Sequence, residues 1–289
     1  MRQICNYRDD THYRHSFNRL AHQVFNMGFE EWYEGGFWDD RYIPHSYADG
    51  GEVVANVSLN VMDVILNGRP HRAAQLGTIM THPNYRRRGL AGELIRSLLK
   101  DCSGYELIYV IGDRQLRDYY PRFGFRPLAE TRFILPVEGR RCGDTSLRRL
   151  NTSDPRDLDL IHRLARMRRP ISRVFGVDNA EGILMWYCFN VLSDCFHYWE
   201  ERDTIVVFRR EGSTVHLFDV IGADRITFDQ LLPHVTDWDT EKMVFHFTPD
   251  RLDVRAETRP LEGDDILFVT GGARWESLRE FKHPTTAQA

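Results

Sequence analysis

The residues best suited to chemistry are three consecutive arginines, Arg86 to Arg88, followed at once by Gly89. A run of β-forming residues at 76–81 precedes them, and apolar residues at helical spacing follow them over 90–99. The stretch therefore predicts a strand, a basic turn and a helix. The first turn of a helix has backbone N–H groups without an intrahelical partner, and the helix dipole favours an anion there.

The composition of this turn indicates which anion fits. Gly89 lets the backbone approach a ligand closely, and the small residues Ala91 and Gly92 keep side chains out of the way. The arginines add charge and forked donors that suit phosphate groups. A pyrophosphate fits this arrangement best. An ordinary arginine-rich helix start on a solvated face would carry the same charges, so charge alone does not decide between the two.

Two blocks of the sequence resemble a known family. Residues 86–91 (Arg-Arg-Arg-Gly-Leu-Ala) are similar to the Arg/Gln-x-x-Gly-x-Gly/Ala motif of the GNAT superfamily of acyl-CoA N-acyltransferases, and Thr81-His82-Pro83 stands where its V-x-P-like strand end would be. Residues 119–125 (Tyr-Tyr-Pro-Arg-Phe-Gly-Phe) resemble the F/Y-Y-x-x-x-G-F signature that closes the same fold. A predicted strand at 107–111 lies between the blocks, and the resemblance covers residues 1–138.

The resemblance implies an α/β (α+β) fold of the GNAT type. This is a mixed, mostly antiparallel sheet flanked by helices, which splays open to admit the pantetheine arm of the cofactor. Residues 11–34 read as helical, 52–66 and 71–81 as strands joined by a hairpin turn at Asn67-Gly68, and 132–137 as a closing strand.

The second half of the chain repeats a similar order of elements. Residues 138–144 form a polar run typical of a linker. We therefore expect a catalytic domain over 1–138, a degenerate GNAT-like domain over 146–275 and a loose polar tail over 276–289. The second half has no arginine motif, and Asp224 stands where a phosphate would bind. An unrelated α+β domain is the alternative.

The resemblance also implies roles for individual residues. The co-substrate is acetyl-CoA. Backbone groups of Ile79, Met80 and Thr81 would pair with pantetheine. The pyrophosphate site would comprise Arg86, Arg87, Arg88, Gly89, Leu90, Ala91 and Gly92. Tyr120 takes the role of the acid that protonates the leaving thiolate, which is reasonable because a tyrosine has a pKa near 10 and a thiol near 8.5. A tyrosine that only packs beneath the sheet is the alternative.

The sequence does not identify the general base. Many relatives carry a glutamate on the strand before the phosphate turn, but residues 73–81 contain no acid. Asp113, Glu52 and the acids between 30 and 40 are candidates, through water or directly. No base is needed if the amine arrives neutral.

The acceptor region is predicted from an aromatic and acidic stretch over 25–47. Such a stretch suits a cationic amine through carboxylate pairing and cation–π contact, and we assign Trp38 and Asp39 to it. Aromatic packing of helices on the sheet would give the same pattern. The block from Gly112 and Asp113 to residue 125 is similar to Eis-like bacterial acetyltransferases, which implies amine substrates.

The composition of the chain argues against several other classes of function. The 289 residues carry a formal net charge of -4, which argues against nucleic acid or an anionic membrane as a partner. No apolar run has the length of a membrane span, and the N-terminus does not resemble a signal peptide. The chain has five cysteines and no C-x-x-C pair, which predicts reduced thiols and a cytoplasmic protein. The histidines do not have the spacing of metal ligands, so no metal site is predicted.

The sequence thus predicts an acetyl-CoA-dependent N-acetyltransferase that acts on a primary amine of a small molecule or peptide. A non-catalytic acyl-CoA sensor or interaction module is a second hypothesis, favoured by the missing glutamate. A third is a tandem-GNAT transferase directed at aminoacyl or thiol groups, which would share the tandem architecture.

Overall fold

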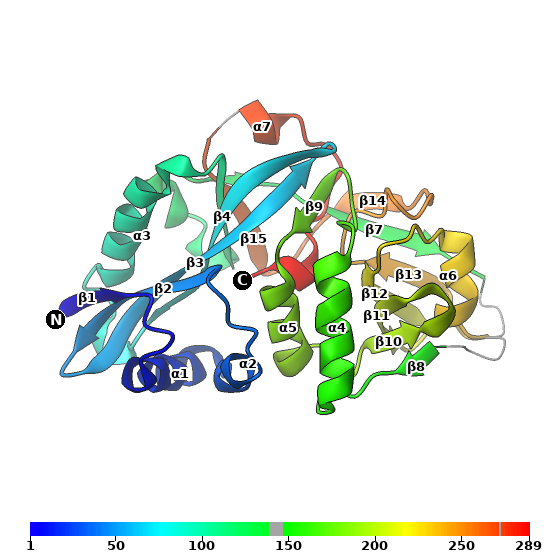
Figure 1. Ribbon diagram of the computed structural model, residues 1–289. Coiled ribbons are helices and arrows are strands. Elements are labelled where there is room, and N and C mark those ends of the chain that lie inside the picture. Colours follow the sequence, from blue (N-terminus) through cyan, green and yellow to red (C-terminus); the bar gives the residue numbers. More distant parts are fainter. Residues whose placement is uncertain (139–146, 272) are drawn as a thin grey trace.

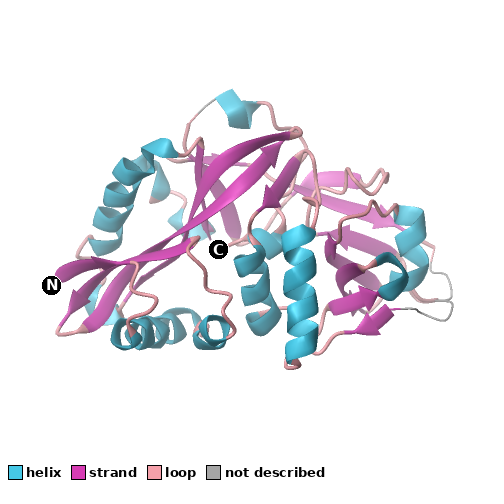
Figure 2. Ribbon diagram, viewed as in Figure 1, coloured by secondary structure: helices cyan, strands magenta, loops and turns pink. Residues whose placement is uncertain are grey.

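The computed structural model describes residues 1–138, 147–271 and 273–289, which form two β-sheets flanked by helices (Figure 1 and Figure 2). Most strand pairs are antiparallel, and among the described residues each sheet contains one parallel pair. This is the predicted architecture of a mixed, mostly antiparallel sheet in each of two units.

The first sheet lies between helices on both faces. Helices α1 (Thr11–Phe25) and α2 (Glu30–Glu34) cover one face, and α3 (Leu90–Asp101) covers the other (Figure 1). Strand β9 (Phe175–Asp178) pairs with the C-terminal end of β3 (Glu52–Leu66). In order across the sheet the strands are β1 (Arg2–Cys5), β2 (Tyr42–Asp49), β3 (Glu52–Leu66), β4 (Arg69–Thr81), β5 (Leu107–Asp113), β15 (Asp265–Val269) and β6 (Arg126–Leu128).

The second sheet repeats part of this plan. Its strands, in order, are β14 (Glu257–Pro260), β7 (Thr131–Pro136), β13 (Lys242–Phe245), β12 (Thr214–Ile221), β11 (Thr204–Glu211), β10 (Phe196–Trp199) and β8 (Leu147–Arg149). The hairpin β11–β12, helix α6 (Phe228–Val235) and β13, parallel to β12, follow the same order as β3–β4, α3 and β5. The remaining helices are α4 (Pro155–Met167), α5 (Glu181–Asn190) and α7 (Ala273–Glu276).

Local sequence signals explain several of these elements. Asn67 and Gly68 both have positive φ, 49° and 80°, so the predicted hairpin turn joins β3 to β4. The Asp10 side chain accepts hydrogen bonds from the backbone of the first turn of α1. The helical stretch predicted over 11–34 is interrupted because Asn26 adopts the left-handed conformation and ends α1.

The two units exchange strands, which the predicted domain boundaries did not anticipate. Strand β15, from the second half of the chain, lies between β5 and β6 in the first sheet. Strand β7, from the first half, lies between β13 and β14 in the second sheet. Residues 1–138 and 146–275 therefore do not each contain a complete sheet. Local hydrophobic pattern predicts a strand but not the sheet edge with which it pairs.

The expectation of a loose polar tail over 276–289 was wrong. Phe281 and His283 are fully buried, and Ala287 is also buried. The Thr286 hydroxyl donates to Asp219 at 2.6 Å. The segment ends between the two sheets (Figure 1). A polar sequence is stable there because its hydrogen-bonding groups find partners in the fold.

Two tryptophans connect the units directly. The Trp32 indole N–H donates to the carbonyl of Gly182 at 2.7 Å, and the Trp186 indole N–H donates to the carbonyl of Gly28 at 3.1 Å. Both rings belong to one aromatic core that α1, α2 and α5 share. The units are thus held by burial as well as by strand pairing.

Candidate active site

The first sheet opens where β4 and β5 separate. Their parallel pairing ends at Leu76 and Val110. A cavity of about 410 Å³ lies at this divergence. Ile79 lines the cavity, whereas the Met80 side chain is buried toward α1. Other residues that line it come from both halves of the chain, namely Phe25, Met27, Phe29, Trp32, Tyr42, Gly77, Thr78, Ile111, Gly112, Asp113, Leu116, Tyr120, Ile183, Trp186, Tyr187, Asp265, Gln288 and Ala289.

A distortion in β4 accompanies the opening. Thr78 has a φ of 45°, an unusual conformation for a β-branched residue, at a shift in the register of β3 and β4. The Asn56 side chain donates to the Thr78 carbonyl at 2.8 Å, and the Tyr42 and Thr78 hydroxyls lie 2.7 Å apart. These contacts hold the bulge in place. Backbone groups of Ile79 to Thr81 lie beyond the last residue of β4 that pairs with β5.

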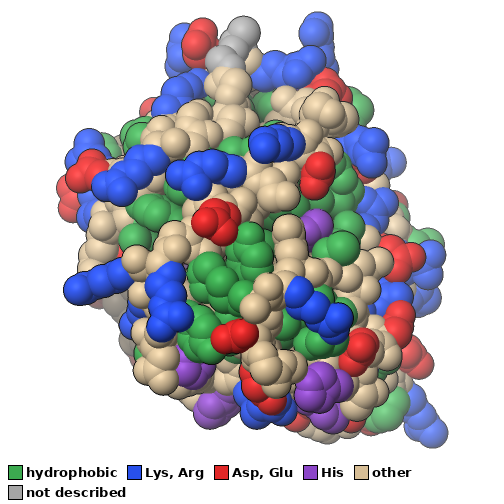
Figure 3. Space-filling view, turned by 90° about the vertical axis from the view of Figure 1, so that its left-hand side faces the viewer, with side chains coloured by type: hydrophobic (Ala, Val, Ile, Leu, Met, Phe, Trp, Pro, Cys, Tyr) green, Lys and Arg blue, Asp and Glu red, His purple; other side chains and the backbone are tan. Residues whose placement is uncertain are grey.

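The arginine turn places a glycine with positive φ at the start of a helix. Gly89 has a φ of 82° and immediately precedes α3, and no side chain caps the first turn of that helix. Arg86 donates to the carbonyl of Thr81 at the end of β4, Arg88 donates to the carbonyl of Asn84 in the turn, and all three arginines are exposed. Figure 3 shows a face of the molecule on which Lys and Arg side chains gather around exposed hydrophobic side chains. The unpaired N–H groups and the cations together suit an anion.

Tyr120 lies in a short 3-10 helix (Tyr120–Phe123) and lines the cavity. Its ring covers Gly112 so closely that a Cβ there would lie 2.4 Å from the ring, and it packs on Phe268 with the centroids 4.9 Å apart. Burial raises the pKa of Tyr120, and Tyr119 and Asp113 raise it further. The phenol therefore stays protonated at neutral pH and is available as a proton donor.

Tyr119 occupies a different environment. Its ring packs edge-on against Phe123, and its hydroxyl lies 3.6 Å from where a Cβ of Gly92 would be. Tyr119 is not among the residues that line the cavity in the described structure. Gly92 at this position lets α3 approach the block that contains both tyrosines.

Two carboxylates lie on neighbouring strands in the cavity wall. Asp113 on β5 is paired in register with Asp265 on β15, and both line the cavity. Burial raises the pKa of Asp265, with a further increase from Asp113. The sequence indicated Asp113 but not Asp265, because 152 positions separate the two in the chain and only the strand exchange brings them together.

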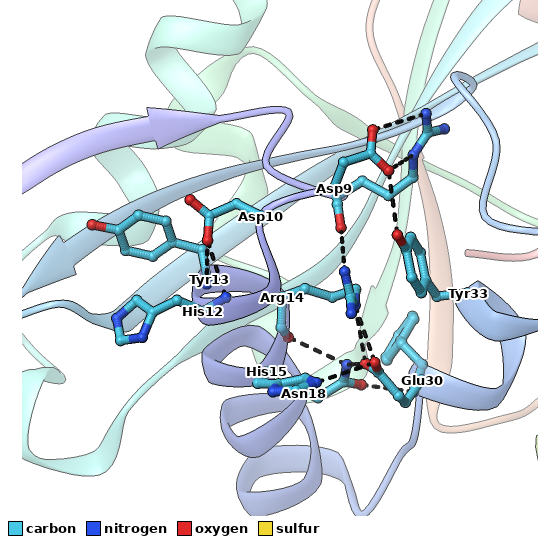
Figure 4. A network of polar contacts seen from close by, with 11 residues as sticks. Asp9, Asp10, His12, Tyr13, Arg14, His15, Asn18, Glu30 and Tyr33 are labelled. Atoms are coloured by element: carbon cyan, nitrogen blue, oxygen red, sulfur yellow. Dashed lines mark hydrogen bonds and ion pairs between the residues drawn. The ribbon is translucent and has the colours of Figure 1, made fainter.

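Glu30 and Glu52, two of the other predicted base candidates, have hydrogen-bond partners away from the cavity. Glu30 accepts from Arg14 at 3.1 Å and from Asn18 at 2.7 Å, in a network that joins α2 to α1 (Figure 4). Glu52 accepts from Ser16 and Arg19, both at 2.6 Å. Neither glutamate is among the residues that line the cavity in the described structure.

Trp38 and Asp39, predicted to contact the acceptor, also lie apart from this cavity. Trp38 is buried, stacks on Trp32 and donates to the carbonyl of Tyr42 at 3.0 Å. Asp39 accepts from the backbone of Arg41 at 2.8 Å. Most aromatic side chains of this stretch therefore serve packing, and Phe25, Phe29, Trp32 and Tyr42 are those that line the cavity.

Among the described residues, no group of three or more histidine, cysteine, aspartate or glutamate side chains is arranged to hold a metal ion. Within the same part of the chain, no helix is long and apolar enough to cross a membrane.

Comparison with known proteins agrees with this geometry. Residues 10–128 match the family model described as an acetyltransferase (GNAT) domain, and this part of the chain is therefore a GNAT acetyltransferase domain. No curated protein matches the chain.

Solved structures share the fold over nearly the whole chain. A probable N-acyltransferase of unknown function from Enterococcus faecalis V583 is 14% identical, with 93% of this chain and 71% of that chain covered and a TM-score of 0.63. Eis1 from Mycobacterium abscessus is 14% identical, with 92% and 73% covered and a TM-score of 0.53. A GCN5-related N-acetyltransferase from Kribbella flavida is 15% identical, with 93% and 70% covered and a TM-score of 0.53. At these identities the likeness shows the fold, and it extends over both units.

Proposed function

We propose that this protein is an acetyl-CoA-dependent N-acetyltransferase that acetylates a primary amine of a small molecule or a peptide. The observation that carries the proposal is Tyr120, a buried, protonated phenol at the cavity where β4 and β5 diverge. Strand β4 leads directly into the arginine turn, so one strand connects the proposed cofactor site to the reaction site. Free Cys102, Cys188 and Cys195 support a reducing, cytoplasmic location as part of the proposal.

The cofactor contacts follow from the order of elements along β4. The N–H groups at the start of α3, with Arg86 to Arg88, would bind the pyrophosphate. Backbone groups of Ile79 to Thr81 would pair with pantetheine, and one N–H would stabilise the charge that develops on the thioester oxygen. Tyr120 would then protonate the departing thiolate.

Replacement of Gly89 by glutamate tests the cofactor site. Gly89→Glu should weaken acetyl-CoA binding at least roughly tenfold, because it places a carboxylate where the pyrophosphate would lie and opposes a positive φ. Isothermal titration calorimetry on the folded variant measures the effect. Gly104→Glu is the matched control, since Gly104 has open space and follows the other end of α3. Unchanged affinity in Gly89→Glu would remove the assignment.

The cavity wall indicates the class of acceptor. Phe29, Trp32 and Tyr42 contribute aromatic surface, while Asp113 and Asp265 contribute negative charge. A hydrophobic molecule that carries an ammonium group would find both features in one cavity. We therefore assign the acceptor contacts to these residues rather than to Trp38 or Asp39.

Asp265 is our choice for the general base, since its raised pKa makes it more basic than an exposed carboxylate. Asp265→Asn should lower kcat/KM for the amine about 10²-fold or more. It should also remove the loss of activity that we expect of wild type as the pH falls through the Asp265 pKa. Asp264→Asn is the adjacent control. If Asp264→Asn and Asp265→Asn have the same pH–rate profile as wild type, Asp265 is not the base.

The same substitution has an expected effect on stability. A folded-state pKa above the unfolded one means that the charged carboxylate is disfavoured in the folded protein. This penalty is absent at low pH, appears as the pH rises above the unfolded pKa and is complete above the folded pKa. Relative to wild type, Asp265→Asn should therefore stabilise the protein more at neutral pH than at acid pH. Thermal unfolding at both pH values measures the difference.

A non-catalytic acyl-CoA-binding module is the second candidate function. The absence of an acidic residue along β4 favours it. Release of free CoA from acetyl-CoA, followed with a thiol reagent across a panel of amines, distinguishes the transferase from the non-catalytic module. Binding of acetyl-CoA without amine-dependent CoA release would favour the module.

A further inference from the structure

The second unit contains its own cavity, of about 340 Å³, which the proposed acetyl transfer does not use. It lies at the end of β12 and includes the loop that leads to α6. Four arginines from three separate segments line it, namely Arg169, Arg173, Arg225 and Arg251.

The positive charge of this cavity is only partly neutralised. Arg225 pairs with Asp253. Asp250 accepts from the Ser172 hydroxyl and from the backbone N–H of Arg173. Asp224 also lines the cavity and carries a further negative charge. These acids leave the remaining guanidinium groups without a carboxylate bound to them.

Arg251 is the clearest example of a cavity arginine without enough hydrogen-bond acceptors. Its Nε is buried and has no hydrogen-bond partner. Burial lowers the pKa of Arg251, Arg173 and Arg169 lower it further, and Asp250 acts in the opposite direction. In the part of the chain that the structure describes, the side chains of Arg169 and Arg173 also form no hydrogen bond or ion pair. A buried donor without a partner is costly, and a bound anion would supply the missing acceptor.

The position of the cavity in the fold is equivalent to that of the arginine turn. That turn connects β4 to α3, and this cavity lies where β12 connects to α6. The route that pantetheine would take is filled in the second unit. Thr285 donates through its backbone to His246 at 3.1 Å, and Thr286 donates to Asp219 on β12. These residues occupy the divergence of β12 and β13, so an anion fits here but an acyl-pantetheine arm does not.

We propose that the cavity lined by Arg169, Arg173, Arg225 and Arg251 binds a small molecule through a phosphate or pyrophosphate group, independently of acetyl-CoA. Arginine forks match phosphate oxygens in geometry and charge. A volume of about 340 Å³ lies within the range of about 300–1,000 Å³ that is typical of small-molecule sites. The arginines substitute for the glycine turn that this unit lacks.

Calorimetric titration of inorganic pyrophosphate tests the site. Wild-type protein saturated with acetyl-CoA should still bind one pyrophosphate per chain, and so should the Gly89→Glu variant. Arg169→Glu and Arg173→Glu should each weaken this binding at least roughly tenfold, because they reverse an exposed charge at the ligand. Arg166→Glu is the control, as Arg166 is an exposed arginine on the same segment that does not line the cavity.

The outcomes separate this proposal from the proposed enzyme activity. No binding to acetyl-CoA-saturated protein, or equal affinity in the Arg166→Glu and Arg173→Glu variants, would overturn the second site and leave the acetyl-CoA site untouched. Tighter binding of a nucleoside diphosphate than of pyrophosphate would also support the site and extend its ligand to a nucleotide. Weaker binding at high salt is expected in either case.

Discussion

Tyr120→Phe should lower kcat by about 10²–10⁴-fold while the protein keeps its fold and its affinity for acetyl-CoA. The substitution keeps the ring that packs on Gly112 and Phe268 and removes only the proton donor. The raised pKa of Tyr120 means that wild type supplies a protonated phenol over the whole neutral range. Steady-state kinetics with calorimetry of acetyl-CoA binding measure both quantities.

Tyr119→Phe is the internal control for this experiment. Tyr119 packs on Phe123 beside α3 and does not line the cavity, so its variant should change kcat little. If Tyr119→Phe were the inactive variant, the acid would be the neighbouring tyrosine. If neither variant lost activity, water would protonate the thiolate and Tyr120 would be a packing residue.

A chain of residues 1–138 alone should fail to form a stable first domain. Without β15 nothing pairs the facing edges of β5 and β6, and the fully buried Leu267, Phe268 and Val269 are missing. Burial of each such side chain contributes about 1.5–3 kcal/mol, which together is comparable with the whole stability of a domain, about 5–15 kcal/mol. Circular dichroism and size-exclusion chromatography report the loss.

Co-expression of residues 1–142 with 143–289 is the matched control. The exchanged strands β7 and β15 should hold the two pieces together, and the complex should bind acetyl-CoA as the intact chain does. A folded, monomeric 1–138 fragment that binds acetyl-CoA would show that β15 is dispensable for the first sheet.

Features determined by short-range sequence could be predicted. The Asn67-Gly68 turn and the glycine before α3 both require positive φ, which a local pattern reveals. The order of helices and strands followed from periodicity in the same way. The Tyr120 block was placed by motif spacing, and the structure puts this tyrosine in the cavity.

Features determined by long-range pairing could not be predicted. The pattern of residues 131–136 marks a strand, but nothing in it specifies the second sheet. Asp265 reaches the cavity only because its strand crosses to the first sheet. The polar sequence of residues 276–289 gave no sign of burial, since its partners, such as Asp219, lie in distant elements.

The strand exchange also has a consequence for synthesis of the chain on the ribosome. Strand β6 is complete about 140 residues before β15 is made. At elongation rates of about 5–20 residues per second, the first sheet waits on the order of ten seconds for its missing strand. During that time the edge of β5 is unpaired, and an unpaired edge can recruit strands from other nascent chains. Slower translation of the second half should therefore increase aggregation, and binding of a chaperone to the exposed edge should reduce it.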